Sequence, residues 1–227
     1  LDITISRLES FMDILYQDNR IVVAIKPPGV LSTDEPGGMP DLLRAALCAA
    51  CIRTVHRLDR KVGGVMVCAR SRKAAAILAA QMQRHEFQKD YLAVVRGFAP
   101  AQGTLRDWLL RDTYAGITSV VPEGTPGAKE SILTYTRLAS KNDTSLLQIH
   151  LLTGRTHQIR VQFSAHGLPL IGDCKYGRAE DGGIALWSYR VGFYHPERGD
   201  FMSFSCPPDG IAPFSAYSAC FSSNSAV

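Results

Sequence analysis

The residues His-Arg-Leu-Asp at 56–59, followed by Arg-Lys-Val-Gly-Gly at 60–64 and Val-Met-Val-Cys-Ala at 65–69, are the most informative stretch of this chain. Consecutive glycines let the backbone turn tightly, and a short apolar run bounded by such a turn is typical of a buried strand. The sequence therefore predicts that Asp59 lies in a loop directly before a core strand.

Basic residues surround Asp59 along the chain. Residues 53–89 contain nine lysines and arginines and only two acidic residues, Asp59 and Glu86, whereas the whole chain has a net charge of +4. A carboxylate among positive charges stays ionised and can act as a nucleophile or a base. A local basic surface suits a polyanionic partner, but a solvated surface without any ligand has the same composition.

Length and composition limit the class of protein. A chain of 227 residues can form one large domain or two small ones. No apolar run reaches the ~18 residues of a membrane span, and the first residues do not resemble a signal peptide. The six cysteines are scattered, which favours reduced thiols and a cytoplasmic location. Cys48 and Cys51 form one CxxC motif, and no second such motif follows at zinc spacing. We therefore expect these two cysteines to serve as small apolar residues on an Ala-rich helix, and we expect no metal site.

The apolar patterns and turn residues predict more strands than helices. Helices are expected at 41–51, at 74–84 with Ser71 as the N-cap, and at 156–166. Strands or hairpins are expected at 13–26, 65–69, 89–97, 100–128, 132–138, 146–152, 184–193 and 201–205. Because these elements do not alternate one for one, we expect an α+β fold with a mixed, mainly antiparallel β-sheet flanked by helices. The expected organisation is a single domain over 1–227, with a core at about 13–207 and a loosely ordered tail after about 209.

Four segments together resemble the RluA-type pseudouridine synthases. The first is His56-Arg57-Leu58-Asp59 with Gly64 and the strand after it. The others are Asp18 to Gly29 with its Lys-Pro-Pro-Gly ending, Lys89-Asp-Tyr-Leu-Ala-Val-Val-Arg-Gly97, and Leu152-Thr-Gly-Arg-Thr-His-Gln-Ile-Arg-Val161 with Gly172-Asp173 beyond it. A four-residue motif alone is weak, but four motifs in the family's order and spacing are specific.

The resemblance implies an isomerase that converts uridine in RNA to pseudouridine, on a catalytic domain with a central RNA-binding cleft. It implies structured RNA, ribosomal or transfer, as the partner. We expect no cofactor, no metal, no membrane and a monomeric protein without an extra N-terminal RNA-binding module.

The resemblance also implies roles for individual residues. Asp59 corresponds to the catalytic carboxylate, which acts on uracil or on the sugar, and Arg160 to the arginine that holds it. Tyr91 corresponds to the tyrosine that stacks on the target base, and Arg57 to an arginine that fills the space left by the flipped uridine. The candidate RNA-binding residues are Arg57, Arg60, Lys61, Arg72, Lys73, Lys89, Arg155 and His157. We expect His56 to be a structural hydrogen-bonding residue, which is also the alternative for His157.

The chain departs from the family pattern after Asp59. The family continues with Thr-Ser-Gly two residues later, where this chain has Val62-Gly63-Gly64. Two hydroxyls that could brace the catalytic loop are therefore missing. This departure keeps open an alternative, an RNA-binding module with the same fold and weak or no turnover. A cysteine-dependent redox protein, resting on Cys48 and Cys51 alone, is a weaker alternative.

Overall fold

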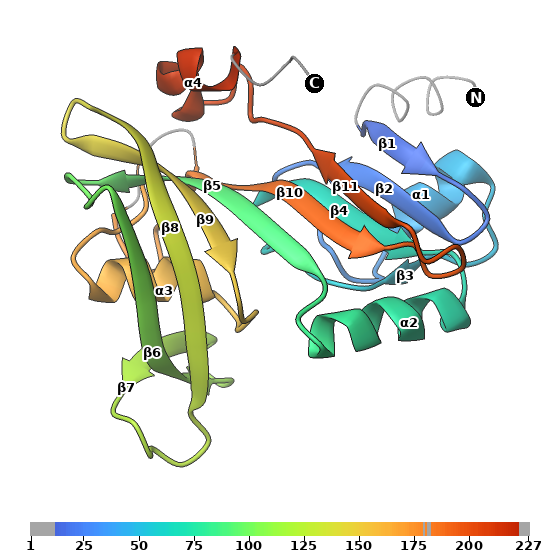
Figure 1. Cartoon of the computed structure of the whole chain (residues 1–227), viewed down its shortest axis with the longest axis horizontal. Coiled ribbons are helices and arrows are strands. Elements are labelled where there is room, and N and C mark those ends of the chain that lie inside the picture. The colour runs from blue at the N-terminus through green and yellow to red at the C-terminus, as the bar shows by residue number, and fades with distance from the viewer. Residues whose placement is uncertain (1–11, 179, 181–182, 223–227) are drawn as a thin grey trace. The chain divides into compact units, whose positions relative to one another are not determined.

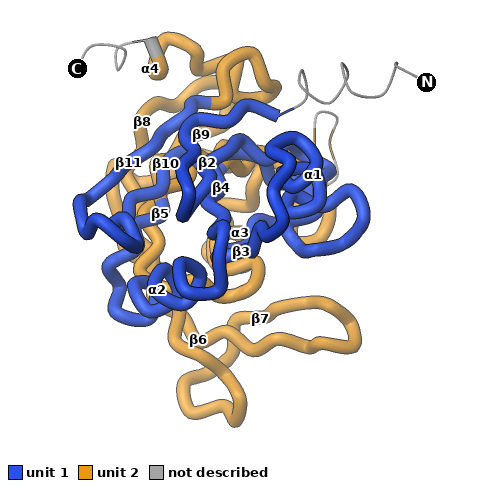
Figure 2. Tube along the Cα trace, turned by 90° about the vertical axis from the view of Figure 1, so that its right-hand side faces the viewer, with its two compact units in different colours: residues 1–89, 188–207 blue, residues 90–187, 208–227 orange. Residues whose placement is uncertain are grey.

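The computed structural model describes residues 12–178, 180 and 183–222 (Figure 1). The chain divides into two compact units, coloured separately in Figure 2: unit 1 comprises residues 1–89 and 188–207, and unit 2 comprises residues 90–187 and 208–227. The N-terminal residues 1–11, where we found no signal peptide, lie outside the described part. The single-domain organisation stays a prediction.

Unit 1 contains antiparallel strands and two helices. Its elements are β1 (Ile14–Gln17), β2 (Ile21–Lys26), α1 (Met39–Leu47), β3 (Arg53–Thr54), β4 (Gly63–Ala69), α2 (Arg72–Gln83) and β11 (Phe201–Ser205). The pairs β1–β2, β2–β4 and β3–β4 are antiparallel. Strand β10 (Leu186–Tyr194) enters this unit at Ser188, lies next to β4 and pairs antiparallel with β11.

The centre of unit 1 is formed by β2 and β4, in which every residue is buried. Such strands have apolar residues on both faces and therefore show a continuous apolar run instead of alternation. The predicted strand at 65–69 is confirmed as part of β4. The predicted cap of the next helix is also confirmed, because the Ser71 hydroxyl oxygen accepts a hydrogen bond from the Ala74 N–H at 3.1 Å.

Gly64 explains the glycine pair at the start of β4. Its φ is +119°, and a Cβ atom at this position would lie 2.2 Å from the Ser188 carbonyl oxygen. Only glycine allows both this backbone conformation and this close approach to β10. The glycine therefore fixes where β4 begins, and with it the position of the loop that precedes the strand.

Unit 2 is built on a second antiparallel group of strands. Its elements are β5 (Gln88–Arg96), which begins in unit 1, β6 (Gln102–Asp112), β7 (Ile117–Val121), β8 (Lys129–Lys141), β9 (Thr144–Leu151) and α3 (Gln158–Ala165). The strands lie in the order β5-β9-β8-β6-β7, with antiparallel pairing throughout. Helix α3 packs on one face of these strands, where the Phe163 and Tyr135 rings contact each other at a centroid distance of 5.3 Å.

The chain after residue 209 is more ordered than expected, as far as Ser222. A 3-10 helix spans Phe214–Tyr217, and a short helix α4 spans Ala219–Ser222. Phe214 and Tyr217 are buried, and the Tyr217 hydroxyl is 2.6 Å from the Thr144 hydroxyl. The apolar area of these aromatic side chains compensates for a Ser- and Ala-rich composition. The end of the predicted tail, residues 223–227, lies outside the described part.

The structure corrects the placement of the CxxC motif. Helix α1 ends at Leu47, and Cys48 adopts a left-handed conformation (φ 46°) as its C-cap. A left-handed residue ends the i to i−4 hydrogen-bond pattern, so Cys51 lies beyond the helix. The other predicted elements are present with shifted ends. The α+β class with a mainly antiparallel sheet is confirmed, while the central RNA-binding cleft stays a prediction.

Candidate active site

Asp59 lies in the loop between β3 and β4 of unit 1, as expected. Its backbone carbonyl accepts a hydrogen bond from the Val62 N–H at 2.9 Å, which closes a tight turn. Leu58 and Val62 on either side are buried, whereas the Asp59 side chain is half-buried. The apolar neighbours anchor the loop in the core of unit 1 and leave the carboxylate of Asp59 at its surface.

Ser32 braces this loop from the preceding segment. The Ser32 hydroxyl accepts a hydrogen bond from the Leu58 N–H at 3.0 Å and donates one to the Leu58 carbonyl at 2.8 Å. On the other side of Asp59, the Arg60 carbonyl accepts a hydrogen bond from the Gly29 N–H at 2.8 Å. The bracing that the sequence lacks at Val62 and Gly63 is therefore supplied by the segment after β2.

Lys26 is the buried cation of this site. Its side chain is fully buried, and its Nζ donates to the carbonyl groups of Pro27, Val30 and Arg60 at 3.0, 2.6 and 3.1 Å. Burial lowers the pKa of Lys26 to about 8, while the negative charge of Asp59 acts in the opposite direction. Sequence analysis did not assign a role to Lys26, although it lies in the Lys-Pro-Pro-Gly motif. The structure places it within electrostatic range of Asp59.

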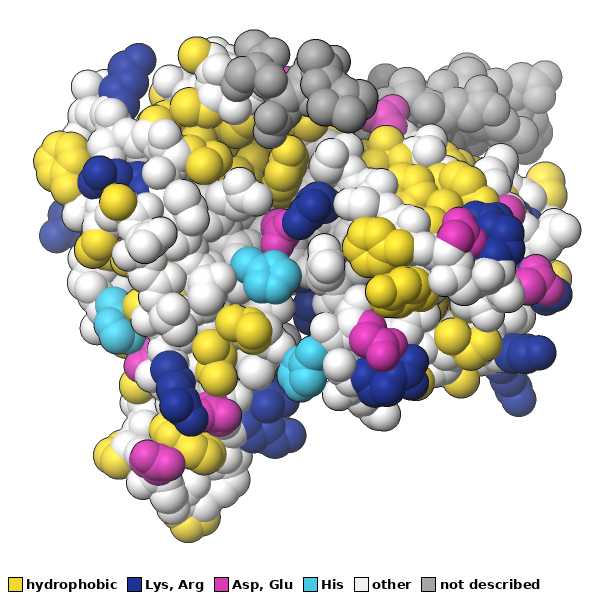
Figure 3. All heavy atoms as spheres, in the orientation of Figure 1, with side chains coloured by type: hydrophobic (Ala, Val, Ile, Leu, Met, Phe, Trp, Pro, Cys, Tyr) yellow, Lys and Arg dark blue, Asp and Glu magenta, His cyan; other side chains and the backbone are white. Residues whose placement is uncertain are grey.

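The basic residues around Asp59 differ in exposure and in contacts. Arg57, Lys61, Arg72 and Lys73 have exposed side chains, as RNA-binding residues require, and Lys89 is half-buried. Several basic residues of the segment have contacts within the protein: Arg60 Nε donates to the Gly29 carbonyl at 3.0 Å, Arg70 donates to the Asp18 carbonyl, and Arg84 pairs with Glu86. On the face shown in Figure 3, basic and acidic side chains adjoin at several places. The net basic character of the segment therefore overstates its accessible positive charge.

Tyr91 lies on β5, opposite Ile149 of β9. Its side chain is 7% exposed, so most of the ring is buried. Because strand residues alternate between faces, the adjacent Asp90 points to the other face, where its carboxylate is 2.6 Å from His150 Nδ1. A buried ring on a strand has a fixed orientation, as core packing also requires, so the stacking role of Tyr91 stays a prediction.

Arg160 lies on α3 and is held by Asp173. Its Nε and Nη2 atoms form a two-pronged ion pair with the Asp173 carboxylate at 2.8 and 2.7 Å, and its guanidinium lies 5.2 Å from the centre of the Tyr176 ring. Burial by itself would raise the pKa of Asp173, but the Arg160 ion pair and the N–H groups of Lys175 and Tyr176 hold it below its usual value. Asp173 was missed as a site residue, although Gly172-Asp173 is part of the quoted motif.

Arg155 and His157 have structural contacts at the start of α3. His157 adopts a left-handed conformation (φ 56°), and its Nδ1 is 2.7 Å from the Tyr176 hydroxyl. Arg155 Nε donates to the Glu130 carbonyl at 3.0 Å. Asp59 belongs to unit 1 and Tyr91 and Arg160 to unit 2, so the pairing of Asp59 with Arg160 stays a prediction.

Among the described residues, no group of three or more His, Cys, Asp or Glu side chains could hold a metal ion. In the same part of the chain, no helix is both long and apolar enough to cross a bilayer.

The chain and its fold have counterparts among known proteins. The family model for RNA pseudouridylate synthase matches residues 20–165, and the chain belongs to this family. The matched range includes Asp59, Tyr91 and Arg160.

Named relatives agree with this assignment. The chain is 31% identical over 223 residues to a "Ribosomal large subunit pseudouridine synthase D" of Neisseria meningitidis, covering 88% of this chain and 59% of that protein. It is 33% identical over 207 residues to the "Uncharacterized RNA pseudouridine synthase YjbO" of Bacillus subtilis, covering 86% of this chain and 72% of that protein. The chain therefore spans less than two thirds of the meningococcal relative.

Solved structures confirm the fold. "Human RNA Pseudouridylate Synthase Domain Containing 1" superposes with a TM-score of 0.75 at 24% identity, covering 92% of this chain and 87% of that one. "Human RNA Pseudouridylate Synthase Domain Containing 4" gives a TM-score of 0.75 at 21% identity, covering 95% and 94%. The predicted fold of a pseudouridine synthase is thereby confirmed.

Proposed function

We propose that this protein isomerises uridine to pseudouridine in structured RNA, with Asp59 as the catalytic residue. The supporting observation is the family match over residues 20–165, which includes all three proposed catalytic residues, Asp59, Tyr91 and Arg160. The geometry of unit 1 adds that the loop of Asp59 is braced on both sides, at Leu58 and at Arg60. This bracing removes the reason for the alternative of an inactive RNA-binding module.

The reaction defines what the residues must do. The bond between the sugar and uracil nitrogen 1 breaks, the uracil turns, and a bond forms between the sugar and uracil carbon 5, which loses its proton while nitrogen 1 gains one. No electron is transferred to or from the RNA and no water is consumed. One group must attack or deprotonate, and the base must leave its stack to reach it.

We assign these tasks to named residues. Asp59 acts on the uracil or on the sugar. Arg160, oriented by Asp173, holds the Asp59 carboxylate, and the ring of Tyr91 stacks on the flipped uracil. Arg57 fills the space that the uridine leaves.

The proposed substrate is ribosomal or transfer RNA. The name of the meningococcal relative favours the large ribosomal subunit. The cytoplasm as the location and the monomer as the active form remain our predictions.

The test is pseudouridine mapping of total RNA from cells with and without the gene, complemented by the wild type or by Asp59→Asn. The wild type should restore one or a few pseudouridines. The Asn variant should restore none, yet bind the same RNA at least as tightly, because a negative charge near phosphate has been removed. Pseudouridine formation by the variant above a few percent of the wild-type level would exclude Asp59 as the catalytic group.

A further inference from the structure

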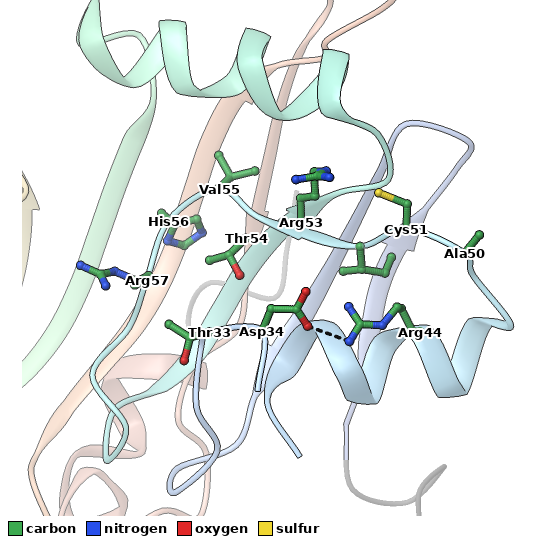
Figure 4. A pocket seen from close by; sticks show the side chains of 11 residues that line it. Thr33, Asp34, Arg44, Ala50, Cys51, Arg53, Thr54, Val55, His56 and Arg57 are labelled. Atoms are coloured by element: carbon green, nitrogen blue, oxygen red, sulfur yellow. Dashed lines mark hydrogen bonds and ion pairs between the residues drawn. The ribbon is translucent and has the colours of Figure 1, made fainter. Parts of the chain in front are cut away.

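Unit 1 contains a cavity beside the catalytic loop whose function is not assigned. It has a volume of about 560 Å3 and is lined by Thr33 and Asp34, by Arg44 of α1, and by residues 50–57 (Figure 4). Ligand cavities generally have volumes of about 300–1,000 Å3, so a nucleotide fits in this volume. The lining segment 50–57 continues directly into Leu58 and Asp59.

Three arginines line this cavity together with a single acid. Arg44 Nη2 pairs with the Asp34 carboxylate at 2.7 Å. Arg44 and, more weakly, Arg53 hold the pKa of Asp34 below its usual value, so Arg53 also lies near this carboxylate. Within the described part of the chain, the guanidinium groups of Arg53 and Arg57 make no hydrogen bond or ion pair. The cavity therefore has an excess of positive charge, and Figure 4 shows Arg53 and Arg57 extending from its wall.

His56 belongs to the same wall, and its ring packs on Phe87 at a centroid distance of 5.5 Å. Its Nε2 accepts a hydrogen bond from the Val67 N–H at 3.1 Å, so the proton of the neutral ring must reside on Nδ1. Burial lowers the pKa of His56 to about 3, which keeps the ring neutral. Nδ1 is buried and has no hydrogen-bond partner among the described residues. Because this donor is sealed from solvent, the exposed arginines Arg53 and Arg57 are the groups of this wall that can reach a ligand.

Hydrogen bonds connect the cavity to the loop of Asp59. The Thr54 hydroxyl donates to the Ser32 carbonyl at 2.8 Å, and the Ser32 hydroxyl in turn holds both backbone groups of Leu58. A group bound in the cavity would therefore have a defined position relative to Asp59.

We propose that this cavity binds the nucleotide of the substrate RNA next to the target uridine, with Arg53 binding its phosphodiester. The proposal rests on the proposed function for its choice of RNA as the ligand. Guanidinium groups bind phosphate oxygens in pairs of parallel hydrogen bonds, and neither Arg53 nor Arg57 is already engaged in this way.

The first experiment measures RNA affinity as a function of salt. The probes are unmodified transcripts of ribosomal RNA and transfer RNA, bound to protein carrying Asp59→Asn so that turnover cannot interfere. Arg53→Ala should weaken binding about tenfold and reduce the slope of log K against log salt by about 0.7, the contribution of one single-strand phosphate. Arg84→Ala is the matched control, because Arg84 is exposed and paired with Glu86 away from the cavity, and it should change neither value.

The second experiment uses the thiol of Cys51, which lines the cavity and is half-buried. Alkylation rates of Cys51 and of the exposed Cys48 are measured by mass spectrometry with RNA, with inorganic phosphate at equal ionic strength, and without either. RNA should slow the alkylation of Cys51 several-fold and leave Cys48 unchanged. Equal protection by inorganic phosphate would overturn the proposal in favour of a free-anion site.

The outcomes separate this proposal from the proposed function. An active wild-type enzyme whose RNA affinity is insensitive to Arg53→Ala, with Cys51 unprotected, would overturn the nucleotide site and leave the synthase activity standing. Protected Cys51 in a wild-type protein that forms no pseudouridine would support the site and overturn the activity.

Discussion

Lys26 Nζ donates a hydrogen bond to the carbonyl of Arg60 at 3.1 Å, so a fully buried ammonium group holds the residue that follows Asp59, the proposed catalytic residue. The same Nζ also holds the carbonyl groups of Pro27 and Val30. Burying a charge is costly unless hydrogen bonds and an opposite charge compensate, and here the carbonyl groups and Asp59 provide both.

This arrangement predicts how stability depends on pH. The pKa of Lys26 falls from 10.5 to about 8 on folding, so between these values the unfolded chain binds more protons than the folded one. The contribution of Lys26 to the free energy of unfolding should therefore rise as the pH increases from about 8 to 10.5. Urea unfolding at several pH values should show this rise in the wild type. Lys26→Met should be less stable at every pH and should lack the rise, and an identical pH dependence in both proteins would contradict the prediction.

Ser32→Ala tests whether the bracing of Leu58 matters for catalysis. The change removes two hydrogen bonds next to Asp59, and we expect a loss of about 1–3 kcal/mol in stability and a roughly tenfold lower single-turnover rate, with RNA affinity unchanged. Ser71→Ala is the control, because it removes the cap of α2 and costs about 1 kcal/mol without touching the loop. Equal rates in the two variants would show that the brace of Ser32 is only structural.

Gly64 and Gly29 both have positive φ values, but their surroundings differ. A Cβ at Gly64 would lie 2.2 Å from the Ser188 carbonyl oxygen, whereas a Cβ at Gly29 would meet nothing within 4 Å. Gly29→Ala should cost only the backbone strain of about 1–2 kcal/mol. Gly64→Ala should cost about 4 kcal/mol or more, since β4 and β10 must separate. Thermal unfolding of both variants measures the difference, and similar losses would show that β4 and β10 can adjust.

Asp173→Asn tests the orientation of Arg160. The pair is nearly inaccessible to solvent, with side-chain exposures of 11% and 1%, so breaking it should cost about 3–5 kcal/mol. Because Arg160 then loses its fixed orientation, the rate at saturating RNA should fall while the affinity for RNA changes little. Asp200→Asn is the control: its pair with Arg198 is solvent-exposed, and stability and rate should stay near wild type. An Asp173→Asn protein with lower stability and a normal rate would restrict Asp173 to a structural role.

Arg57 and Arg72 are both exposed, yet we expect different behaviour. Arg57→Ala should lower the single-turnover rate even at saturating RNA, because the flipped uridine is no longer replaced in the stack. Arg72→Ala should lower only the affinity and its salt dependence. Rates measured over a range of salt separate the two roles. If both variants lose only affinity, Arg57 is a phosphate contact and has no part in base flipping.

The sequence by itself determined the order and type of most elements up to residue 205 and the identity of the loop that carries Asp59, but not the short helices after residue 209. These features depend on local signals: the apolar run of 65–69, the glycine pair before it and the Ser71 cap all act within a few residues. The predicted end of the first helix, at residue 51, was wrong. Cys48 ends α1 through a left-handed conformation that non-glycine residues rarely adopt.

Only the tertiary structure decided what holds the loop and the side chains around it. Ser32 and Leu58 are 26 residues apart in the chain, Lys26 and Arg60 are 34 apart, and Gly64 requires contact with a strand that starts at Leu186. Such contacts leave no periodic pattern, since each joins one donor to one acceptor across the fold. For the same reason, the missing hydroxyls at Val62 and Gly63 pointed to a weak loop, whereas folding supplies the bracing from residues distant in sequence.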